Sequence, residues 1–156
     1  MTINSYKKSE DLRTIVTELN GKQDKMTHRP AFSCAGSGSY TPTTGNQNIS
    51  SFCGGTVIFD QCGNLDNGKF TAPITGLYHF DLKLQVTYSS GYLIAYVYKN
   101  GSTMPNHNIQ FYQTSNTYTL SFTTFAKEGD YFEPYINNNY AGGTVSSPIW
   151  CGHYIG

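Results

Sequence analysis

The sequence has few charged residues and no excess of either sign. Lys and Arg number ten, Asp and Glu also number ten, and together they make up only 13% of the 156 residues. A chain with this balance lacks the basic surface that attracts nucleic acid or an anionic membrane. It also lacks an apolar run approaching the roughly 20 residues that span a bilayer. We therefore predict that the protein binds no nucleic acid and inserts into no membrane.

The start of the given sequence also predicts no signal peptide, and this bears on the cysteines. The start of the chain, MTINSYKKSEDLRT, has no apolar core of the kind that directs secretion. The cysteines are Cys34, Cys53, Cys62 and Cys151. An even number would allow two disulfides in an oxidising compartment, whereas a cytosol would leave small buried thiols. Because the chain carries no secretion signal of its own, we expect buried free thiols.

The spacings that catalytic and metal sites require are also absent. The four histidines are scattered, no serine lies in a G-x-S-x-G elbow, and no H-E-x-x-H or C-x-x-C spacing occurs. Asp60, Asp66 and Glu133 could meet in space as a carboxylate group, although acids on different strands are more often surface charges. We predict no enzyme, no catalytic residue, no metal site and no cofactor. Structural calcium or another metal stays open as an alternative.

What is present favours strands and turns. Gly, Thr, Tyr and Asn are frequent, and the length suits one domain with a sizeable core. The most informative stretch is FDQCGNLDNGKFTAPITGLYHF, residues 59–80. Asn67-Gly68 supplies the positive φ angles of a tight turn, and Pro73 restricts its surroundings to edge or connecting geometry. From Leu77 onward apolar and polar residues alternate, so the chain is predicted to be all-β.

Several positions in that stretch keep a register that resembles the globular head of complement C1q. They are Phe59, Asp60, Asn64, Gly68, Phe70, Ala72, Pro73, Gly76, Tyr78 and Phe80. The similarity runs from about Pro30 to the C-terminus, because Gly129-Asp130 resembles the family's late turn and residues 150–155 resemble its final aromatic-x-Gly-aromatic strand. Cys151 and His153 depart from the residues usual there. The resemblance implies a ten-stranded jelly-roll sandwich of the C1q and tumour necrosis factor (TNF) type, assembled as a homotrimer.

The chain is predicted to divide into a short helical stalk end with a linker, residues 1–29, and a head, residues 30–156. Ser9 is the predicted N-cap, and Leu12, Ile15 and Leu19 have the spacing of one helix face. So short a helix is marginal alone, so we expect it to pack against copies of itself as a coiled coil. A frayed terminal arm is the alternative. The following residues, GKQDK, resemble linkers in bacteriophage tail-fibre stalks.

Short runs separated by turns predict the strands of the head. The candidate strands are residues 31–35, 56–59, 76–88, 92–100, 109–113, 118–127, 130–137 and 148–155. Residues 37–51, SGSYTPTTGNQNISS, are rich in turn formers and predict a long surface loop. In strand 76–88, one face carries Tyr78, Phe80, Leu82, Leu84 and Val86. We predict that this face lies in the core.

Strand 92–100 is apolar on both faces and therefore needs a second burial partner. In a two-layer sandwich that partner is most simply another subunit, and the family resemblance points to a three-fold axis lined by tyrosines. The predicted trimer interface consists of Leu12, Ile15, Leu19, Tyr92, Ile94, Tyr96 and Tyr98. The alternative is that the rings cover the outer sheet with their hydroxyl groups in water.

Strand alternation predicts which loops lie far from the stalk. If the last strand returns to the stalk, connections 87–91, 113–117 and 137–147 and loop 37–50 lie at the distal tip. The candidate receptor-binding residues there are Tyr40, Asn46, Asn48, Tyr88, Ser89, Ser90, Asn116, Asn137, Asn138, Asn139 and Tyr140. Amides and hydroxyls beside aromatic rings suit a neutral glycan, and the same residue types suit a protein receptor. Asn and Gly also occupy turns for backbone reasons alone.

These observations favour a trimeric receptor-binding head of a bacteriophage tail fibre, or of a phage-derived injection device. Such a head lies at the tip of the virion's fibre and attaches to a bacterial surface glycan or an outer-surface protein. A secreted C1q- or TNF-like recognition or signalling protein is the alternative. A surface-polysaccharide-degrading enzyme is a weak third candidate, because no catalytic constellation can be named.

Overall fold

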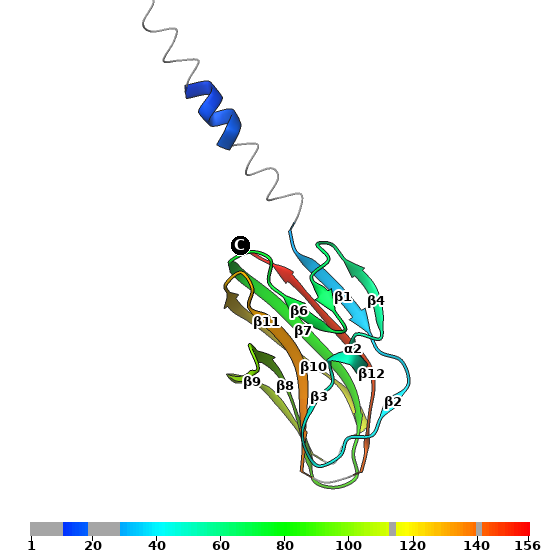
Figure 1. Ribbon diagram of the computed structural model, residues 1–156. Coiled ribbons are helices and arrows are strands. Elements are labelled where there is room, and N and C mark those ends of the chain that lie inside the picture. Colours follow the sequence, from blue (N-terminus) through cyan, green and yellow to red (C-terminus); the bar gives the residue numbers. More distant parts are fainter. Residues whose placement is uncertain (1–10, 19–28, 113–114, 140–141) are drawn as a thin grey trace, which may run out of the picture.

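The computed structural model describes residues 11–18, 29–112, 115–139 and 142–156. Residues 29–156 form two facing antiparallel sheets, as Figure 1 shows. We call the first the β7 sheet. Its strand order is β10 (Ser115–Ala126), β7 (Gly76–Thr87), β12 (Thr144–Tyr154), β1 (Ala31–Ala35) and β4 (Thr56–Asp60). The short strand β2 (Ser39–Tyr40) also pairs with β12. We call the second the β8 sheet. Its strand order is β5 (Leu65–Asp66), β6 (Lys69–Thr71), β11 (Tyr131–Asn138), β8 (Tyr92–Lys99) and β9 (Ser102–Tyr112). Strand β3 (Gly45–Asn48) also pairs with β11. The predicted jelly-roll sandwich is confirmed. The described residues contain twelve strands rather than ten, two of them only two residues long.

The core forms between the two sheets from alternating side chains. The predicted core face of β7 is confirmed, because Tyr78, Phe80, Leu82, Leu84 and Val86 are all buried. Aromatic rings from both sheets meet there: the Phe32 and Phe70 ring centroids lie 4.6 Å apart, and those of Phe80 and Phe132 also 4.6 Å. Such offset ring pairs add to the stabilisation that burial itself provides.

The final strand shows why its unusual residues are tolerated. Trp150 is fully buried and Gly152 lies against Phe80, so closely that a Cβ at Gly152 would overlap the ring. Cys151 and His153 alternate with these residues and lie on the outer face of the β7 sheet. The two departures from the family pattern therefore avoid the core.

Strand direction is as predicted. The first strand and the C-terminus lie at one end of the head, where the Tyr154 N–H donates to the Pro30 carbonyl at 2.8 Å (Figure 1). Because the long strands alternate, the last residues of β7, β9 and β11 all lie at the opposite end (Figure 1). We call these the stalk end and the distal end.

The loop predicted for residues 37–51 is wrong in part. It contains β2, β3 and the start of α2 (Ser50–Cys53), and Ile49 is fully buried. Residues 45–48 form a strand because the free edge of β11 offers backbone partners, a contact between distant residues that local turn composition does not reveal.

Strand β9 also begins earlier than predicted, at Ser102. The preceding Asn100-Gly101 turn has φ angles of 52° and 75°, so the hairpin closes tightly and pairing resumes at once.

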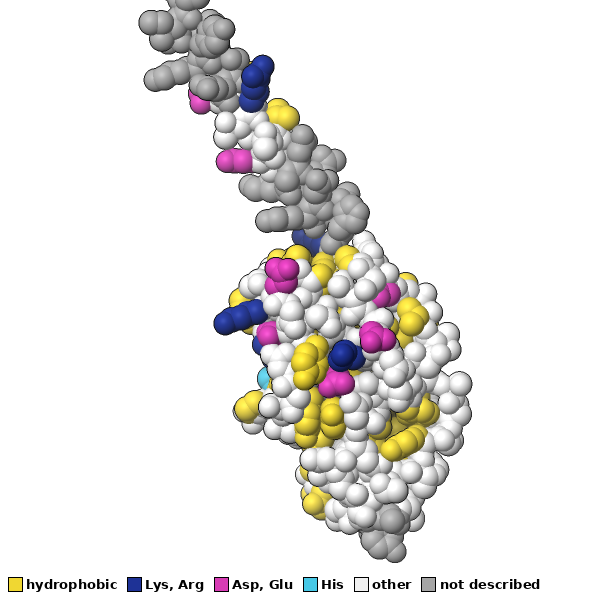
Figure 2. Space-filling model, viewed as in Figure 1, with side chains coloured by type: hydrophobic (Ala, Val, Ile, Leu, Met, Phe, Trp, Pro, Cys, Tyr) yellow, Lys and Arg dark blue, Asp and Glu magenta, His cyan; other side chains and the backbone are white. Residues whose placement is uncertain are grey.

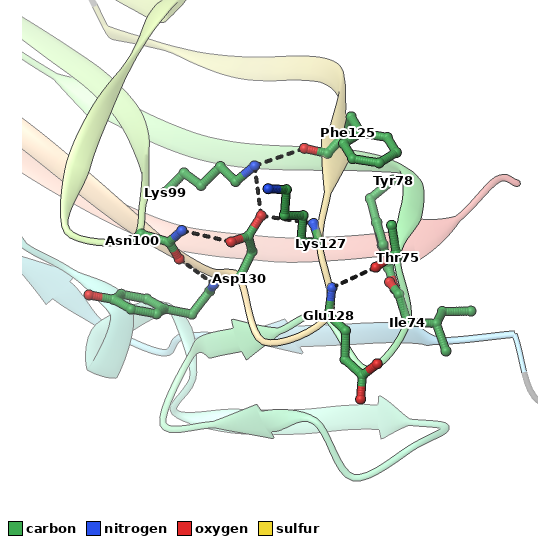
Figure 3. Close-up of polar contacts among 10 residues, drawn as sticks. Ile74, Thr75, Tyr78, Lys99, Asn100, Phe125, Lys127, Glu128 and Asp130 are labelled. Atoms are coloured by element: carbon green, nitrogen blue, oxygen red, sulfur yellow. Dashed lines mark hydrogen bonds and ion pairs between the residues drawn. The ribbon is translucent and has the colours of Figure 1, made fainter.

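A polar network ties the connections at the stalk end together (Figure 3). The carboxylate of Asp130 accepts hydrogen bonds from Asn100 Nδ2 at 2.7 Å and from the Lys127 N–H at 2.8 Å, and it pairs with Lys99 Nζ at 2.8 Å. Burial alone would raise the pKa of Asp130, but these donors outweigh it and hold the pKa at about 2. The turn that resembles the family's late turn is thus held by one ionised side chain.

The helix lies where it was predicted within the described residues, and two of the four cysteines are buried as expected. Residues 11–18 are helical, and Leu12 and Ile15 are half exposed in the single chain. The predicted cap Ser9 and the seam residue Leu19 lie outside the described residues. The described residues include no helix both long and apolar enough to cross a bilayer.

All four cysteines are free thiols. Cys34 and Cys53 are buried as expected, whereas Cys62 and Cys151 are only partly so.

Candidate functional site

The outer face of the β8 sheet carries a group of tyrosine and asparagine side chains. Residues of β8 alternate, so Leu93, Ala95 and Val97 are buried. On the opposite, outward face lie the partly covered residues Tyr92, Ile94, Tyr96 and Tyr98. Strands β11 and β3 add outward-facing residues beside them. The group, called the tyrosine–asparagine surface here, consists of Asn46, Asn48, Tyr96, Tyr98, Tyr135 and Asn137.

Hydrogen bonds and ring stacking hold this surface together. Asn46 Oδ1 accepts from the Tyr96 hydroxyl at 2.8 Å and from Asn137 Nδ2 at 2.5 Å. Asn46 Nδ2 donates to the Tyr98 hydroxyl at 3.3 Å. The Tyr98 and Tyr135 rings stack with centroids 3.9 Å apart and planes 8° apart. Partial burial raises the pKa of the Tyr96 hydroxyl, which therefore stays protonated at neutral pH.

This arrangement joins residues that the sequence assigned to different roles. Asn46 and Asn137 were predicted to bind a receptor, and Tyr96 and Tyr98 to line a trimer axis. Strand pairing makes them neighbours, since Asn46 lies opposite Asn137 and β8 lies beside β11. Rings fixed by stacking beside amide groups combine apolar area with hydrogen-bonding capacity at little cost in side-chain entropy. The surface can therefore act as a binding platform.

The distal end holds several other predicted receptor-binding residues. An open depression of about 560 Å³ lies there, lined by Thr41, Thr87, Tyr88, Ser89, Ser115, Gly143 and Thr144. Asn116 is exposed beside it, and its Oδ1 accepts from the Thr117 N–H. Ser90 is partly exposed. These small polar groups form a shallow surface rather than an enclosed pocket.

Other predicted residues at this end serve the fold. Tyr88 is 4% exposed and Asn138 only 1%, so the single chain leaves little of either side chain open to a receptor. Asn138 Nδ2 instead donates to the Pro42 carbonyl at 3.2 Å. Tyr40 is partly buried against Phe52, and Asn139 Oδ1 accepts from the Tyr92 N–H. Tyr140 lies outside the described residues.

The opposite outer face, on the β7 sheet, exposes apolar side chains near the stalk end. Leu77 and Phe125 lie opposite each other on β7 and β10 and are 43% and 52% exposed. Ile155 lies next to them, since its N–H donates to the Leu77 carbonyl, and is 42% exposed. On β4, Phe59 is 49% exposed. The sequence did not predict this apolar face, because the exposure of a side chain depends on which other strands of the fold cover it.

Carboxylates and possible metal ligands are sparse in the described part of the chain. Asp60 Oδ2 accepts from the Leu65 N–H at 2.8 Å and so closes a turn. Asp66 and Glu133 line one pocket, which is described below. Among the described residues no group of three or more His, Cys, Asp or Glu side chains could hold a metal ion.

Comparison with known proteins identifies the fold. No family model and no curated protein matches the sequence. Solved structures do match: the globular domain of a zebrafish complement 1qA protein is 18% identical, with 81% of this chain and 98% of that chain covered and a TM-score of 0.54. The PRD1 vertex protein P5 is 14% identical over 81% and 97%, with a TM-score of 0.59. Murine APRIL is 9% identical over 81% and 99%, with a TM-score of 0.60. The chain therefore has the predicted C1q- and TNF-like fold.

Proposed function

We propose that this chain forms the trimeric head at the tip of a bacteriophage tail fibre, or of a phage-derived injection device, and attaches it to a glycan or protein on the bacterial surface. The tyrosine–asparagine surface carries this proposal. Fixed tyrosine rings can cover the apolar face of a sugar while the neighbouring amides bind its hydroxyl groups. Similar residues also dominate protein-binding loops.

The position of the stalk supports the proposal. The chain enters the head beside its C-terminus, so a fibre attached there leaves the distal end and the outer faces free (Figure 1). The exposed apolar residues Leu12 and Ile15 of the short helix fit a coiled coil with two further copies. A head held in this way presents its receptor-binding surface outward.

Three copies assemble through the apolar face of the β7 sheet. Leu77, Phe125 and Ile155 form a contiguous exposed apolar group, which marks an interaction surface. The hydroxyls of Tyr96 and Tyr98 already have partners within the chain, so these tyrosines need no second subunit. This assembly leaves one binding surface open on each subunit, and such multivalency raises avidity by about 10² to 10⁴.

Two charged substitutions distinguish the two candidate interfaces. Leu77→Asp places a charge in the apolar face and should convert the trimer into monomers, measured by light scattering after size exclusion. Tyr96→Asp should leave the trimer intact. The reverse result, monomers from Tyr96→Asp alone, would support the tyrosine-lined axis predicted from sequence and reject the β7-sheet interface.

Attachment tests the binding surface. Replacing Asn46 by Ala removes the amide that joins Tyr96, Tyr98 and Asn137, and should weaken attachment to fractionated bacterial surface material at least tenfold. Asn116→Ala, an exposed asparagine at the distal end, is the matched control and should attach normally. If only Asn116→Ala weakens attachment, the receptor site lies at the distal depression instead. Head that attaches to no bacterial fraction would reject the proposed function.

A secreted recognition or signalling protein is the second candidate, and the fold similarity to complement 1qA and APRIL favours it. The four free cysteines argue against it, because small extracellular domains generally pair their cysteines. Attachment to bacterial surface material separates the phage head from a signalling protein, which has no reason to bind such material.

A further inference from the structure

A polar pocket of about 290 Å³ lies beside the tyrosine–asparagine surface. Its lining includes Asn48, Ser50, Asp66, Asn67, Lys69 and Glu133. Figure 2 shows acidic and basic side chains next to each other near the middle of this side of the head, beside hydrophobic side chains. The volume lies at the lower end of the range of about 300 to 1,000 Å³ that ligand pockets occupy, so it suits a small ligand.

Close backbone contact brings the lining residues together. The β5–β6 hairpin turns at Asn67-Gly68 with φ angles of 48° and 79°, as the sequence predicted. Gly68 lies so close to the Ser50 carbonyl that a Cβ there would overlap it. The turn therefore rests on α2, which brings Asp66 and Asn67 next to Ser50. Glycine is required here twice, for the positive φ and for the close approach.

Polar groups in the pocket lack partners within the described chain. Ser50 is 4% exposed, and its Oγ is buried with no hydrogen-bond partner among the described residues. An unsatisfied buried hydroxyl is unfavourable by about 1 to 3 kcal/mol, and such groups in a native structure often mark a ligand or water. Lys69 Nζ lies 5.5 Å from the centroid of the Tyr131 ring, and no salt bridge among the described residues joins it to Asp66 or Glu133. Donors and acceptors are thus both available.

The framework around the pocket is held in place. Asn48 Nδ2 donates to Glu133 Oε1 at 3.0 Å and to the Tyr135 hydroxyl at 3.2 Å, while Asn48 Oδ1 accepts from the Ser50 N–H at 2.8 Å. Alternation along β11 puts Tyr131, Glu133 and Tyr135 on the same outward face. An aromatic ring therefore lies on either side of the pocket carboxylate.

We propose that this pocket binds one neutral sugar residue, an inference that rests on the proposed function and names its ligand. Sugar hydroxyl groups both donate and accept, which matches a lining of two carboxylates, one ammonium group, two amides and two serine hydroxyls, of which the Ser50 hydroxyl is buried. The two acids repel phosphate and acidic sugars. The ammonium group of Lys69 opposes a metal cation, and only two carboxylates line the pocket as charged ligands.

Saturation-transfer difference NMR on the full chain tests this proposal. The probes are glucose, galactose, mannose and N-acetylglucosamine, with glucuronic acid as the charged comparison. At least one neutral sugar should bind with a Kd in the millimolar range, more tightly than glucuronic acid. Binding by none of the neutral sugars up to about 100 mM, or tighter binding of glucuronic acid, would overturn the proposal.

Two substitutions locate the site. Glu133→Gln and Asp66→Asn should each weaken binding of that sugar at least tenfold, about 1.4 kcal/mol, because each removes a charged hydrogen-bond acceptor. Glu128→Gln, an exposed acid at the stalk end, should bind as the wild type does. Unchanged binding in both pocket variants, with unchanged trimer mass and melting temperature, would place the sugar elsewhere.

The outcomes separate this inference from the proposed function. If the head attaches to bacterial material while both pocket variants bind sugar and attach normally, the pocket assignment fails and the function stands. If a neutral sugar binds the pocket but the head attaches to no bacterial fraction, the proposed function fails and the pocket assignment stands.

Discussion

Replacing Asp130 by Asn tests the network that holds the stalk end of the head. The carboxylate has an ordinary pKa of 3.8, but the pKa is about 2 in the folded chain because hydrogen bonds from Lys99, Asn100 and the Lys127 N–H outweigh the effect of burial. One pKa unit corresponds to about 1.4 kcal/mol, so ionised Asp130 stabilises the fold by about 2 kcal/mol. The side chains of Asp130 and Lys99 are 15% and 26% exposed, so solvent screens only part of this.

The stabilisation should depend on pH in one direction. Because the folded pKa of Asp130 lies below its unfolded value, the contribution is fully present above about pH 4 and is lost as the pH falls toward 2. Asn resembles the protonated acid at every pH. The difference in free energy of unfolding between wild type and Asp130→Asn should therefore be about 2 kcal/mol at pH 7 and shrink toward zero at pH 2.

Urea unfolding at a fixed protein concentration measures this difference. Trp150 is the only tryptophan and is fully buried, so its fluorescence reports unfolding of the core. Glu128→Gln removes an exposed acid from the same turn and should change stability by less than about 0.5 kcal/mol. A difference between wild type and Asp130→Asn that stays constant from pH 7 to pH 2 would refute the role assigned to the ionised carboxylate.

Three further outcomes are expected. Gly152→Ala should lower the free energy of unfolding by about 1 to 3 kcal/mol, because the added Cβ would overlap the Phe80 ring. A Cβ at Gly55 would have ordinary contacts, so Gly55→Ala should be nearly neutral, and equal effects of the two substitutions would contradict this packing. Asn138→Ala should destabilise the fold by about 1 kcal/mol in urea, through loss of its bond to Pro42, and unchanged stability would argue against its burial. Thiol reagents at pH 8 should label Cys62 well before Cys53, since burial raises the pKa of Cys53; equal rates would contradict this.

Local pattern was enough to predict most long strands. Alternation from Leu77 onward predicts a half-buried strand wherever that segment lies, because side chains on a strand point to opposite faces. Asn67-Gly68 predicts its turn for a similarly local reason, since few other residues adopt positive φ at low cost. These properties belong to neighbours in sequence, so they could be read without knowing the rest of the fold.

Elements stabilised by distant partners could not be predicted in this way. Residues 45–48 look like loop by composition and become a strand only because β11 offers an edge. Tyr88 and Asn138 look like exposed tip residues, yet the loop at Pro42 covers Asn138. Burial of a polar side chain depends on a segment far away in sequence, which local propensity does not describe.

The sequence by itself determined the fold class, the positions of most long strands along the chain and which face of β7 points inward, because period-two patterning and turn residues act locally. Only the tertiary structure decided what the outward faces do. Strand pairing brought Asn46 to Tyr96 and Asp66 to the pocket of Glu133, and it left Leu77 uncovered. A binding surface depends on which distant residues become neighbours, and in a β sandwich the sheet order sets this.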